Sequence, residues 1–432
     1  FASHHHGDHY TPKIFSLGMD NVRYILATCI RLSAKRKAGL GIDDSCIYRL
    51  RAGVTQIIGE VTVTTVRSND AGVAFVVKTA EGSFFHAGEL NDWYWAEEAA
   101  EWVSYCNDME NQLRISHGRK EPYHVHYWQI GNETSYDKNG YSSDKAIEVT
   151  KRFAKAMKEA DPSIHLIGWG DEGSGDDSWC RKMAQVEEID TIAFHHHFDS
   201  GLENSPLTGT KYREDPETTW KHLMHAYRSL EAHIKKMRAD CGDKRLVMTE
   251  GHYALPGRNR NEVLSTWGAG VSYARCLNVI MRNSDIIDIA TMADFFGNVW
   301  QVNAILMTTQ GEKIAYFQPV ATVMSLFSHH QGEFAVDLQC EGDEKSLDVT
   351  ATKTDDRIYL HLANTDRCNA VSCKLNVDGK EIRGVKMFGV AEDPMTEVTP
   401  VNPDVFAVRE METEGDTILV PPAAVAVVEI LV

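Results

Sequence analysis

The sequence lacks the features that mark a membrane-spanning, secreted or nucleic-acid-binding protein. No apolar run reaches the ~18 residues that a membrane helix needs, and no basic-then-apolar signal segment opens the chain. Positive charge is scarce as well, since 44 lysines and arginines stand against 62 aspartates and glutamates, a net charge of −18. This acidic excess repels phosphate backbones and anionic membranes. We therefore expect neither nucleic acid nor a membrane as a partner, and an uncharged substrate such as a sugar fits better.

The nine cysteines form neither a CxxC pair nor a compact disulfide framework, and their number is odd. Several of them lie inside apolar runs, as Cys276 does. We therefore expect reduced, mostly buried thiols in a cytoplasmic protein. The chain opens with Phe1 rather than Met, which leaves export open.

The length of 432 residues predicts two or three domains, because one hydrophobic core rarely extends over so long a chain. Between about residues 122 and 330, short apolar runs alternate with longer amphipathic ones. This alternation is typical of an α/β domain with a parallel sheet, either a barrel or an open doubly wound sheet. The expected strands cover residues 124–130, 164–169, 191–195, 245–249 and 286–292, and the clearest helices cover residues 143–160 and 311–328.

The two ends of the chain follow other patterns. After His330 the residues 346–352, 357–363 and 423–431 read as short strands with no helical pattern between them, which predicts an antiparallel β-sandwich. The first 95 residues hold a histidine-rich opening. They also contain a basic helical stretch and two β-like runs, at residues 31–37, 61–66 and 72–78.

Two glutamates follow predicted strands of the α/β region. Glu133 comes after Gly131 and Asn132, and Glu250 comes after Thr249. At the carboxyl ends of barrel strands both acids would face one pocket. Hydrolysis of a glycosidic bond needs such a pair, because one carboxyl protonates the leaving oxygen while an ionised one attacks the anomeric carbon. A single strand-end glutamate is more often a helix cap or a surface ion-pair partner, but two in one series favour catalysis.

These motifs resemble clan A of the glycoside hydrolases and, within it, family 51, the α-L-arabinofuranosidases. The resemblance covers roughly residues 96–432. It extends to the helix before the acid/base strand, the sixth strand, the segment after the eighth strand and the C-terminal domain, at residues 97–107, 190–195, 302–305 and from about 331. It implies an α/β fold with a (β/α)8-type barrel. It also implies a retaining α-L-arabinofuranosidase that acts on arabinose-containing plant polysaccharides or oligosaccharides and needs no cofactor.

By this resemblance Glu133 is the acid/base and Glu250 is the nucleophile. Asn132 is expected to hydrogen-bond the sugar hydroxyl next to the anomeric carbon. The other residues expected to bind substrate are His195, His197, Tyr253 and Asn303. His197 stands where the family has a tyrosine that holds the nucleophile, and the residues after Glu250 stand where a tryptophan is usual. These departures bear on which sugar is bound more than on hydrolysis itself.

The opening of the chain carries a metal-like motif, HxHxDH, whose side chains can bind two zinc ions. The four expected ligands are His4, His6, Asp8 and His9. Residues 85–93 resemble the metal-bridging strand of the metallo-β-lactamase fold. A remnant of a purification tag is the other interpretation of the histidines. Because Glu89 replaces the usual bridging aspartate and further ligands are missing, we expect no productive two-zinc site.

The expected architecture therefore has three parts, namely a metallo-β-lactamase-like segment (1–95), a barrel catalytic domain (96–330) and a C-terminal β-sandwich (331–432). Strands one to three of the barrel are not recognisable, so the barrel is incomplete unless the first segment or a partner chain fills the gap. Three functions stay open: an arabinofuranosidase, a catalytically silent mosaic or binding protein, and a zinc-dependent hydrolase acting through the first segment. A carbohydrate is the expected partner, and assembly into a homo-oligomer is left open.

Overall fold

The computed structural model describes residues 2, 22–31, 44–67, 73–79, 83–86, 95–136, 142–253, 262–291, 296–297, 304–307, 315–342 and 345–432. The chain divides into two compact units. Unit 1 consists of residues 1–169 and 186–190, and unit 2 of residues 170–185 and 191–432. The main division thus falls inside the predicted α/β region, whereas the three-part division at residues 95 and 330 stays a prediction.

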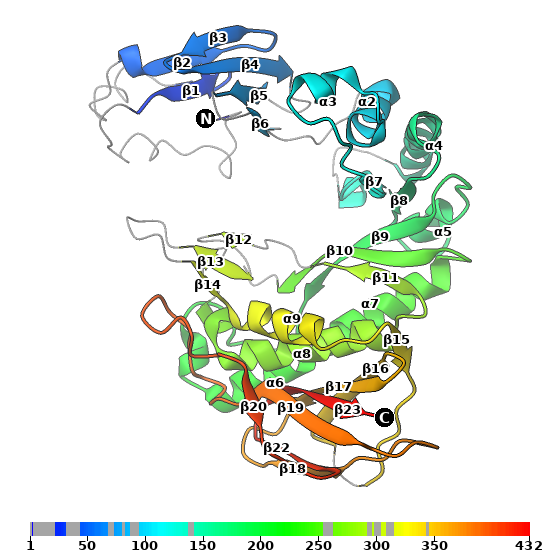
Figure 1. Cartoon of the computed structure of the whole chain (residues 1–432), viewed down its shortest axis with the longest axis vertical. Coiled ribbons are helices and arrows are strands. Elements are labelled where there is room, and N and C mark those ends of the chain that lie inside the picture. Colours follow the sequence, from blue (N-terminus) through cyan, green and yellow to red (C-terminus); the bar gives the residue numbers. More distant parts are fainter. Residues whose placement is uncertain are drawn as a thin grey trace. The chain divides into compact units, whose positions relative to one another are not determined.

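Unit 1 opens with two small sheets (Figure 1). One pairs β1 (Tyr24–Ala27) in parallel with β2 (Ile47–Leu50). The other is antiparallel, and its strands in spatial order are β3 (Thr55–Ile58), β4 (Val61–Arg67), β5 (Val73–Lys78) and β6 (Ser83–His86). The strands predicted at 61–66 and 72–78 are therefore confirmed. The predicted helix at 31–37 lies outside the described residues apart from Arg31, which is in no helix.

Unit 1 continues with helices and a pair of parallel strands. These are α2 (Ala96–Asn107), α3 (Gln112–Ser116), β7 (Tyr127–Ile130), α4 (Ser143–Ala160) and β8 (His165–Trp169). The predicted helix at 143–160 is confirmed, and the Ser142 hydroxyl caps it by accepting a hydrogen bond from the Lys145 amide (3.2 Å). The strand expected from residue 124 begins only at Tyr127. His124 adopts a left-handed φ of 55°, which no β-strand accommodates.

Unit 2 begins with a parallel sheet covered by helices. Its strands are β9 (Thr191–Phe198), β10 (Arg245–Tyr253) and β11 (Ile287–Ala290), with β10 between the other two. The helices are α5 (Trp179–Met183), α6 (Pro216–His225), α7 (Tyr227–Asp240), α8 (Trp267–Arg282) and α9 (Pro319–His329). Figure 1 shows α7, α8 and α9 between this sheet and the strands that end the chain. All three predicted strands exist, and β9 and β10 both run several residues further than predicted.

The helix predicted at 311–328 is wrong for residues 315–318, and residues 311–314 lie outside the described ones. Ala315–Phe317 forms β14, which pairs with β13 (Ile305–Met307), and α9 begins only at Pro319. Proline disfavours helical backbone in the residue before it but fits the first helical position, so Gln318 is extended and the helix begins after it. A third short strand, β12 (Phe296–Gly297), completes this sheet.

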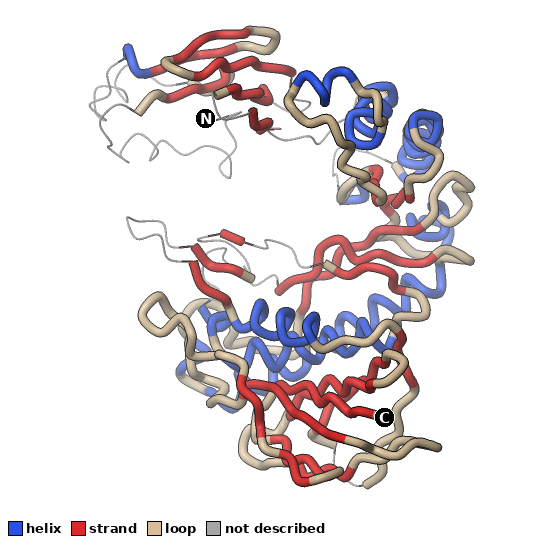
Figure 2. Tube along the Cα trace, viewed as in Figure 1, coloured by secondary structure: helices blue, strands red, loops and turns tan. Residues whose placement is uncertain are grey.

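The chain ends in an antiparallel β domain with two sheets. One has the order β15-β16-β17-β23-β19-β20 and the other the order β18-β22-β21. Their bounds are Phe334–Val336 (β15), Leu347–Lys353 (β16), Arg357–Asn364 (β17), Val371–Lys374 (β18), Gly384–Val390 (β19), Arg409–Met411 (β20), Thr413–Glu414 (β21), Thr417–Val420 (β22) and Val425–Leu431 (β23). Side chains from both sheets share one apolar core, as the predicted sandwich requires. Figure 2 shows strands and loops alone among the described residues after α9.

The cysteines are free thiols, as expected, but only Cys180, Cys241 and Cys276 are buried. Cys340 and Cys368 are exposed and the other four are half-buried, so the expectation of mostly buried thiols is wrong. The described helices include none that is long and apolar enough to cross a bilayer.

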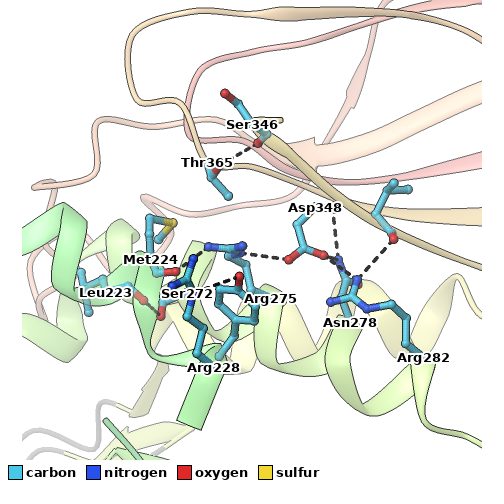
Figure 3. A network of polar contacts seen from close by, with 12 residues as sticks. Leu223, Met224, Arg228, Ser272, Arg275, Asn278, Arg282, Ser346, Asp348 and Thr365 are labelled. Atoms are coloured by element: carbon cyan, nitrogen blue, oxygen red, sulfur yellow. Dashed lines mark hydrogen bonds and ion pairs between the residues drawn. The ribbon is translucent and has the colours of Figure 1, made fainter. Parts of the chain in front are cut away.

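A buried carboxylate holds the C-terminal β domain against helix α8 (Figure 3). Asp348 on β16 is 7% exposed and lies 3.0 Å from Arg275 Nε and 2.7 Å from Arg282 Nη1, both on α8. Asn278, one turn along the same helix, donates a further hydrogen bond to Asp348 Oδ1 (3.1 Å). The Arg275 guanidinium also lies over the Tyr227 ring. A buried carboxylate is costly without partners, and here two cations and an amide supply them.

Burial alone would raise the pKa of the Asp348 carboxyl, but Arg282 and Arg275 outweigh it and hold this pKa below its ordinary value. A lowered pKa means that the carboxylate stabilises the fold at neutral pH. That stabilisation is lost as the pH falls through the folded-state pKa.

We predict that Asp348→Ala lowers the free energy of unfolding by about 3 kcal/mol, because two guanidinium groups lose their common carboxylate. Urea unfolding at neutral pH measures the change. Asp416→Ala is the matched control, because Asp416 pairs with Lys374 at the surface of the same unit, and its loss should cost less than about 1 kcal/mol. Equal losses in the two variants would contradict this account.

Candidate active site

In unit 1, a strained turn after β7 presents Glu133. Gly131 and Glu133 both have left-handed backbone, with φ of 82° and 51°. Glycine adopts this conformation freely, whereas a residue with a side chain pays about 1–2 kcal/mol. Such strain in a non-glycine residue is concentrated at functional sites. The turn therefore holds Glu133 where an unstrained chain would not.

Contacts from the strands β7 and β8 hold this turn. The side-chain amide of Gln129 donates to the Gly131 carbonyl (2.8 Å), and the Trp169 indole N–H donates to the Ser135 hydroxyl (2.8 Å). The Tyr136 amide donates to the carbonyl of Glu133 itself (2.8 Å). Trp169 ends β8 and is buried, so the turn after β7 is anchored on the neighbouring strand. Asn132, the predicted ligand of a sugar hydroxyl, is exposed at the tip of the turn.

In unit 2, the pairing of β9 with β10 contains an irregularity at Thr249. Met248 lies opposite Phe194, but the next pair is Glu250 with His195, so Thr249 has no opposite residue. An extra residue of this kind is a β-bulge, and it changes the face on which every later side chain of the strand points. Glu250 therefore lies on the face of His195 and not on the face of Met248.

The two faces of this strand pair have different chemistry. Glu250 and His195 share one face with the next pair along, His252 and His197. The rings of His197 and His252 are in contact on this face, with His197 Nδ1 3.2 Å from His252 Nε2. On the opposite face His196 bonds to the hydroxyl of Ser229 on α7 (2.9 Å). That face packs on helices, while the first carries three histidines and a carboxylate.

His195 is the nearest described imidazole to Glu250 in unit 2. Its side chain is fully buried, and Nε2 lies 3.1 Å from the Thr249 hydroxyl and 3.6 Å from Glu250 Oε1. An imidazole N–H at this position stabilises negative charge on the carboxylate. His196 differs, because burial first and then the neighbouring His233 lower its pKa to about 3, so it is neutral at pH 7. The structure thus brings together the predicted residues His195 and Glu250.

Tyr253 does not occupy the position expected of a substrate-binding residue. It is 1% exposed, and its hydroxyl bonds to the Ser272 hydroxyl on α8. The strand was predicted to end at Thr249, but it continues to Tyr253, and alternation then turns this side chain toward the helices. Burial therefore argues against substrate contact. The predicted Asn303, Glu89 and the zinc ligands His4, His6, Asp8 and His9 lie outside the described residues.

Sequence reasoning missed two polar residues that contact predicted site residues. Asp171 lies two residues beyond β8, and its carboxylate accepts a hydrogen bond from the His195 amide (3.3 Å). His252, which follows Glu250 by two, contacts His197. The signal for Asp171 was available, because it is a carboxylate just beyond the end of a predicted parallel strand, as Glu250 is.

Comparisons with known proteins bear on the fold and on the family. Residues 33–213 match the α-L-arabinofuranosidase 1 domain, and residues 251–422 match the α-L-arabinofuranosidase C-terminal domain. A probable α-L-arabinofuranosidase C of Aspergillus niger is 38% identical over 157 residues, which are 35% of this chain and 28% of that protein. The intracellular exo-α-(1→5)-L-arabinofuranosidase 1 of Bacillus subtilis is 31% identical over 115 residues, 24% and 23% of the two chains. The chain thus spans less than a third of these curated relatives.

Solved structures extend the likeness over most of the chain. The family 51 arabinofuranosidase of Xanthomonas axonopodis pv. citri has a TM-score of 0.65 at 22% identity, covering 79% of this chain and 74% of that one. The α-L-arabinofuranosidase of Thermotoga maritima has a TM-score of 0.59 at 21% identity, covering 78% and 73%. These neighbours imply an α/β barrel followed by a C-terminal β domain. The fold is thus that of a class of glycoside hydrolases.

Two domain models of the α-L-arabinofuranosidases thus match separate stretches of this chain. The metallo-β-lactamase-like segment predicted for residues 1–95 receives no support from the comparisons. The arabinofuranosidase match begins at residue 33, inside that segment. A short pattern of histidine, glycine and acidic residues is too unspecific to outweigh a match of this length.

We predict that Glu133→Gly is more stable than Glu133→Ala by about 1 kcal/mol. Both variants lose the carboxyl group, but only glycine relieves the left-handed backbone. Because neither variant has the carboxyl group, the difference between their urea midpoints measures the backbone strain at residue 133 alone. An alanine variant as stable as the glycine variant would show that the turn stores no strain at this residue.

Proposed function

We propose that this chain is a retaining glycoside hydrolase that removes α-L-arabinofuranosyl groups from arabinose-containing plant polysaccharides or oligosaccharides. The observation that carries the proposal is the irregularity at Thr249, which turns Glu250 to the face of His195. The two matched domains support the substrate class, as do the names of the Aspergillus and Bacillus relatives.

The proposed mechanism requires Glu133 and Glu250 to act on the same anomeric carbon. Glu133 follows β7, which runs parallel to β8, and Glu250 lies in the last part of β10, which runs parallel to β9. In an α/β barrel the carboxyl ends of all strands open on the same side. A retaining mechanism requires the two carboxyl groups about 5–5.5 Å apart, so that one attacks while the other protonates.

The chemistry then runs in two steps. The Glu133 carboxyl gives its proton to the glycosidic oxygen as that bond to the anomeric carbon breaks, and the Glu250 carboxylate forms a covalent bond to the same carbon. In the second step the Glu133 carboxylate removes a proton from water, whose oxygen attacks the anomeric carbon and releases Glu250. Two inversions at one carbon give overall retention.

The neighbouring residues have supporting roles in this proposal. Asn132 is exposed beside Glu133 and binds the hydroxyl next to the anomeric carbon. His195 stabilises the ionised form of Glu250, from which it lies 3.6 Å away. His197 projects from the same face and, with His252, takes the place of the expected tyrosine, so it bears on the choice of sugar.

Two rival functions remain for comparison. A catalytically silent binding protein would keep the fold without turnover, and a zinc hydrolase would act through residues 1–95. The match over residues 33–213 favours neither, because it assigns much of that segment to the arabinofuranosidase domain. A cytoplasmic location is also a proposal, supported by the name of the Bacillus relative.

We predict different defects in two glutamate variants, assayed on 4-nitrophenyl α-L-arabinofuranoside. Glu250→Ala should abolish turnover, because no other group forms the glycosyl–enzyme bond. Glu133→Ala should keep the first step, since nitrophenolate leaves without a proton, but the second step should be slow. Azide should then restore part of the rate by replacing the activated water.

Glu217→Ala is the matched control, because Glu217 forms a surface ion pair with Arg367 and should leave turnover unchanged. Wild-type protein without activity on this substrate would contradict the proposed function. Active wild-type protein whose two glutamate variants respond alike to leaving group and azide would contradict the roles assigned to the two acids.

We predict that removal of metal leaves this activity unchanged, because the proposed mechanism uses two carboxylates and no Lewis acid. Dialysis against a chelator, followed by metal analysis and the same assay, tests the point. Two tightly held zinc ions per chain, with hydrolysis abolished on chelation, would favour the zinc hydrolase instead.

A further inference from the structure

A side chain, and not a backbone carbonyl, accepts a hydrogen bond from the amide of His195 in β9. Gly170, just beyond β8, still donates to the carbonyl of Ala193 (3.0 Å), as a strand residue would. One step further the His195 amide meets the carboxylate of Asp171 at 3.3 Å. The Asp171 side chain therefore takes the place of a backbone carbonyl that a neighbouring strand would supply.

Asp171 is also tied to helix α7 and to its own loop. The residue is 1% exposed, and a buried carboxylate is costly unless it is paired. His233 Nε2 of α7 lies 3.1 Å from Asp171 Oδ1, without the geometry of a hydrogen bond. The Glu172 amide donates to the same oxygen (2.7 Å). The Asp171 carboxylate thus connects His195 of β9 to helix α7.

His195 contacts both Asp171 and Glu250, and it therefore links the Asp171 carboxylate to the candidate site. Its amide is held by Asp171, while its ring nitrogen lies 3.1 Å from the Thr249 hydroxyl and 3.6 Å from Glu250. The ring is fully buried, so it has little freedom to compensate for a shift of its backbone. A contact at 3.6 Å weakens with a displacement of a few tenths of an ångström.

We propose that Asp171 is a positioning residue, which holds His195 against Glu250 and so stabilises the negative charge of the nucleophile. This inference deepens the proposed function and rests on it. Asp171 touches neither the substrate nor Glu250 in this account. Its effect passes through the backbone of His195, and His233 assists by fixing the carboxylate.

Four variants of the full chain test the proposal. Asp171→Ala removes the acceptor, Asp171→Asn keeps an amide oxygen that can still accept from the His195 amide, and His233→Gln removes the partner on α7. Asp240→Asn is the matched control, because Asp240 is a mostly buried carboxylate of the same unit paired with Arg181. Two readouts are taken: turnover of 4-nitrophenyl α-L-arabinofuranoside, and the imidazole ¹⁵N resonances of His195, assigned by their loss in His195→Gln.

We expect Asp171→Ala to lower kcat at least about ten-fold with KM changed less than about two-fold, because transition-state charge stabilisation is lost while binding is kept. The His195 resonances should shift in the same variant. Asp171→Asn and His233→Gln should change both readouts in the same direction by smaller amounts, and Asp240→Asn should change neither. If Asp171→Ala does not fold, Asp171→Asn and His233→Gln test the proposal with the same two readouts.

A variant with lowered thermal stability but unchanged His195 resonances and kcat would overturn the proposal, because Asp171 would then be structural only. The proposed function can fail separately. If the wild-type protein does not hydrolyse the arabinofuranoside, that function is wrong, and the His195 resonances still show whether Asp171 positions this ring.

Discussion

The register of β10 against β9 is the constraint on which the candidate site depends. Side chains alternate along a strand, so one residue without an opposite partner reverses the face of all that follow. Thr249 is that residue, and it separates Met248, which faces the helices with Phe194, from Glu250, which faces the other way with His195. Regular pairing would bury the carboxylate of Glu250 against α7 and α8, where a charge is costly. In the proposed mechanism the bulge is therefore required, because it keeps Glu250 on the face of His195.

Helix α8 and the C-terminal β domain stabilise β10 from the face opposite to Glu250, and so maintain this register. Tyr253, the last residue of β10, bonds to Ser272 of α8. The first amide of that helix, Trp267, donates to a carbonyl of the β domain at residue 396 (2.9 Å), which satisfies a group that a helix leaves unpaired. Further along the helix, Asp348 pairs with two arginines. The β domain thus supports the strand that carries Glu250 without supplying a described residue of the site.

Local patterns in the sequence were enough for some of these features and not for others. The helix Ser143–Ala160 was predictable because apolar residues recur at helical spacing and Asp161 with the following proline ends it. Glu133 was recognisable as an acid that follows a strand, whereas Glu250, also predicted to follow one, lies within β10. The bulge at Thr249 was not, since register depends on the partner strand. Tyr253 was misplaced for the same reason, because its direction follows from a strand longer than its apolar pattern. The metallo-β-lactamase-like assignment rested on a pattern too short to be specific.

Trapping the glycosyl–enzyme intermediate tests the central claim most directly. Glu133→Ala protein mixed with 4-nitrophenyl α-L-arabinofuranoside should accumulate this intermediate, because departure of nitrophenolate needs no acid while hydrolysis of the intermediate lacks its base. After rapid denaturation and proteolysis, mass spectrometry should find one added pentosyl group on the peptide that contains Glu250. The absence of an adduct during turnover by this variant, or an adduct on another residue, would contradict the assignment of Glu250 as the nucleophile.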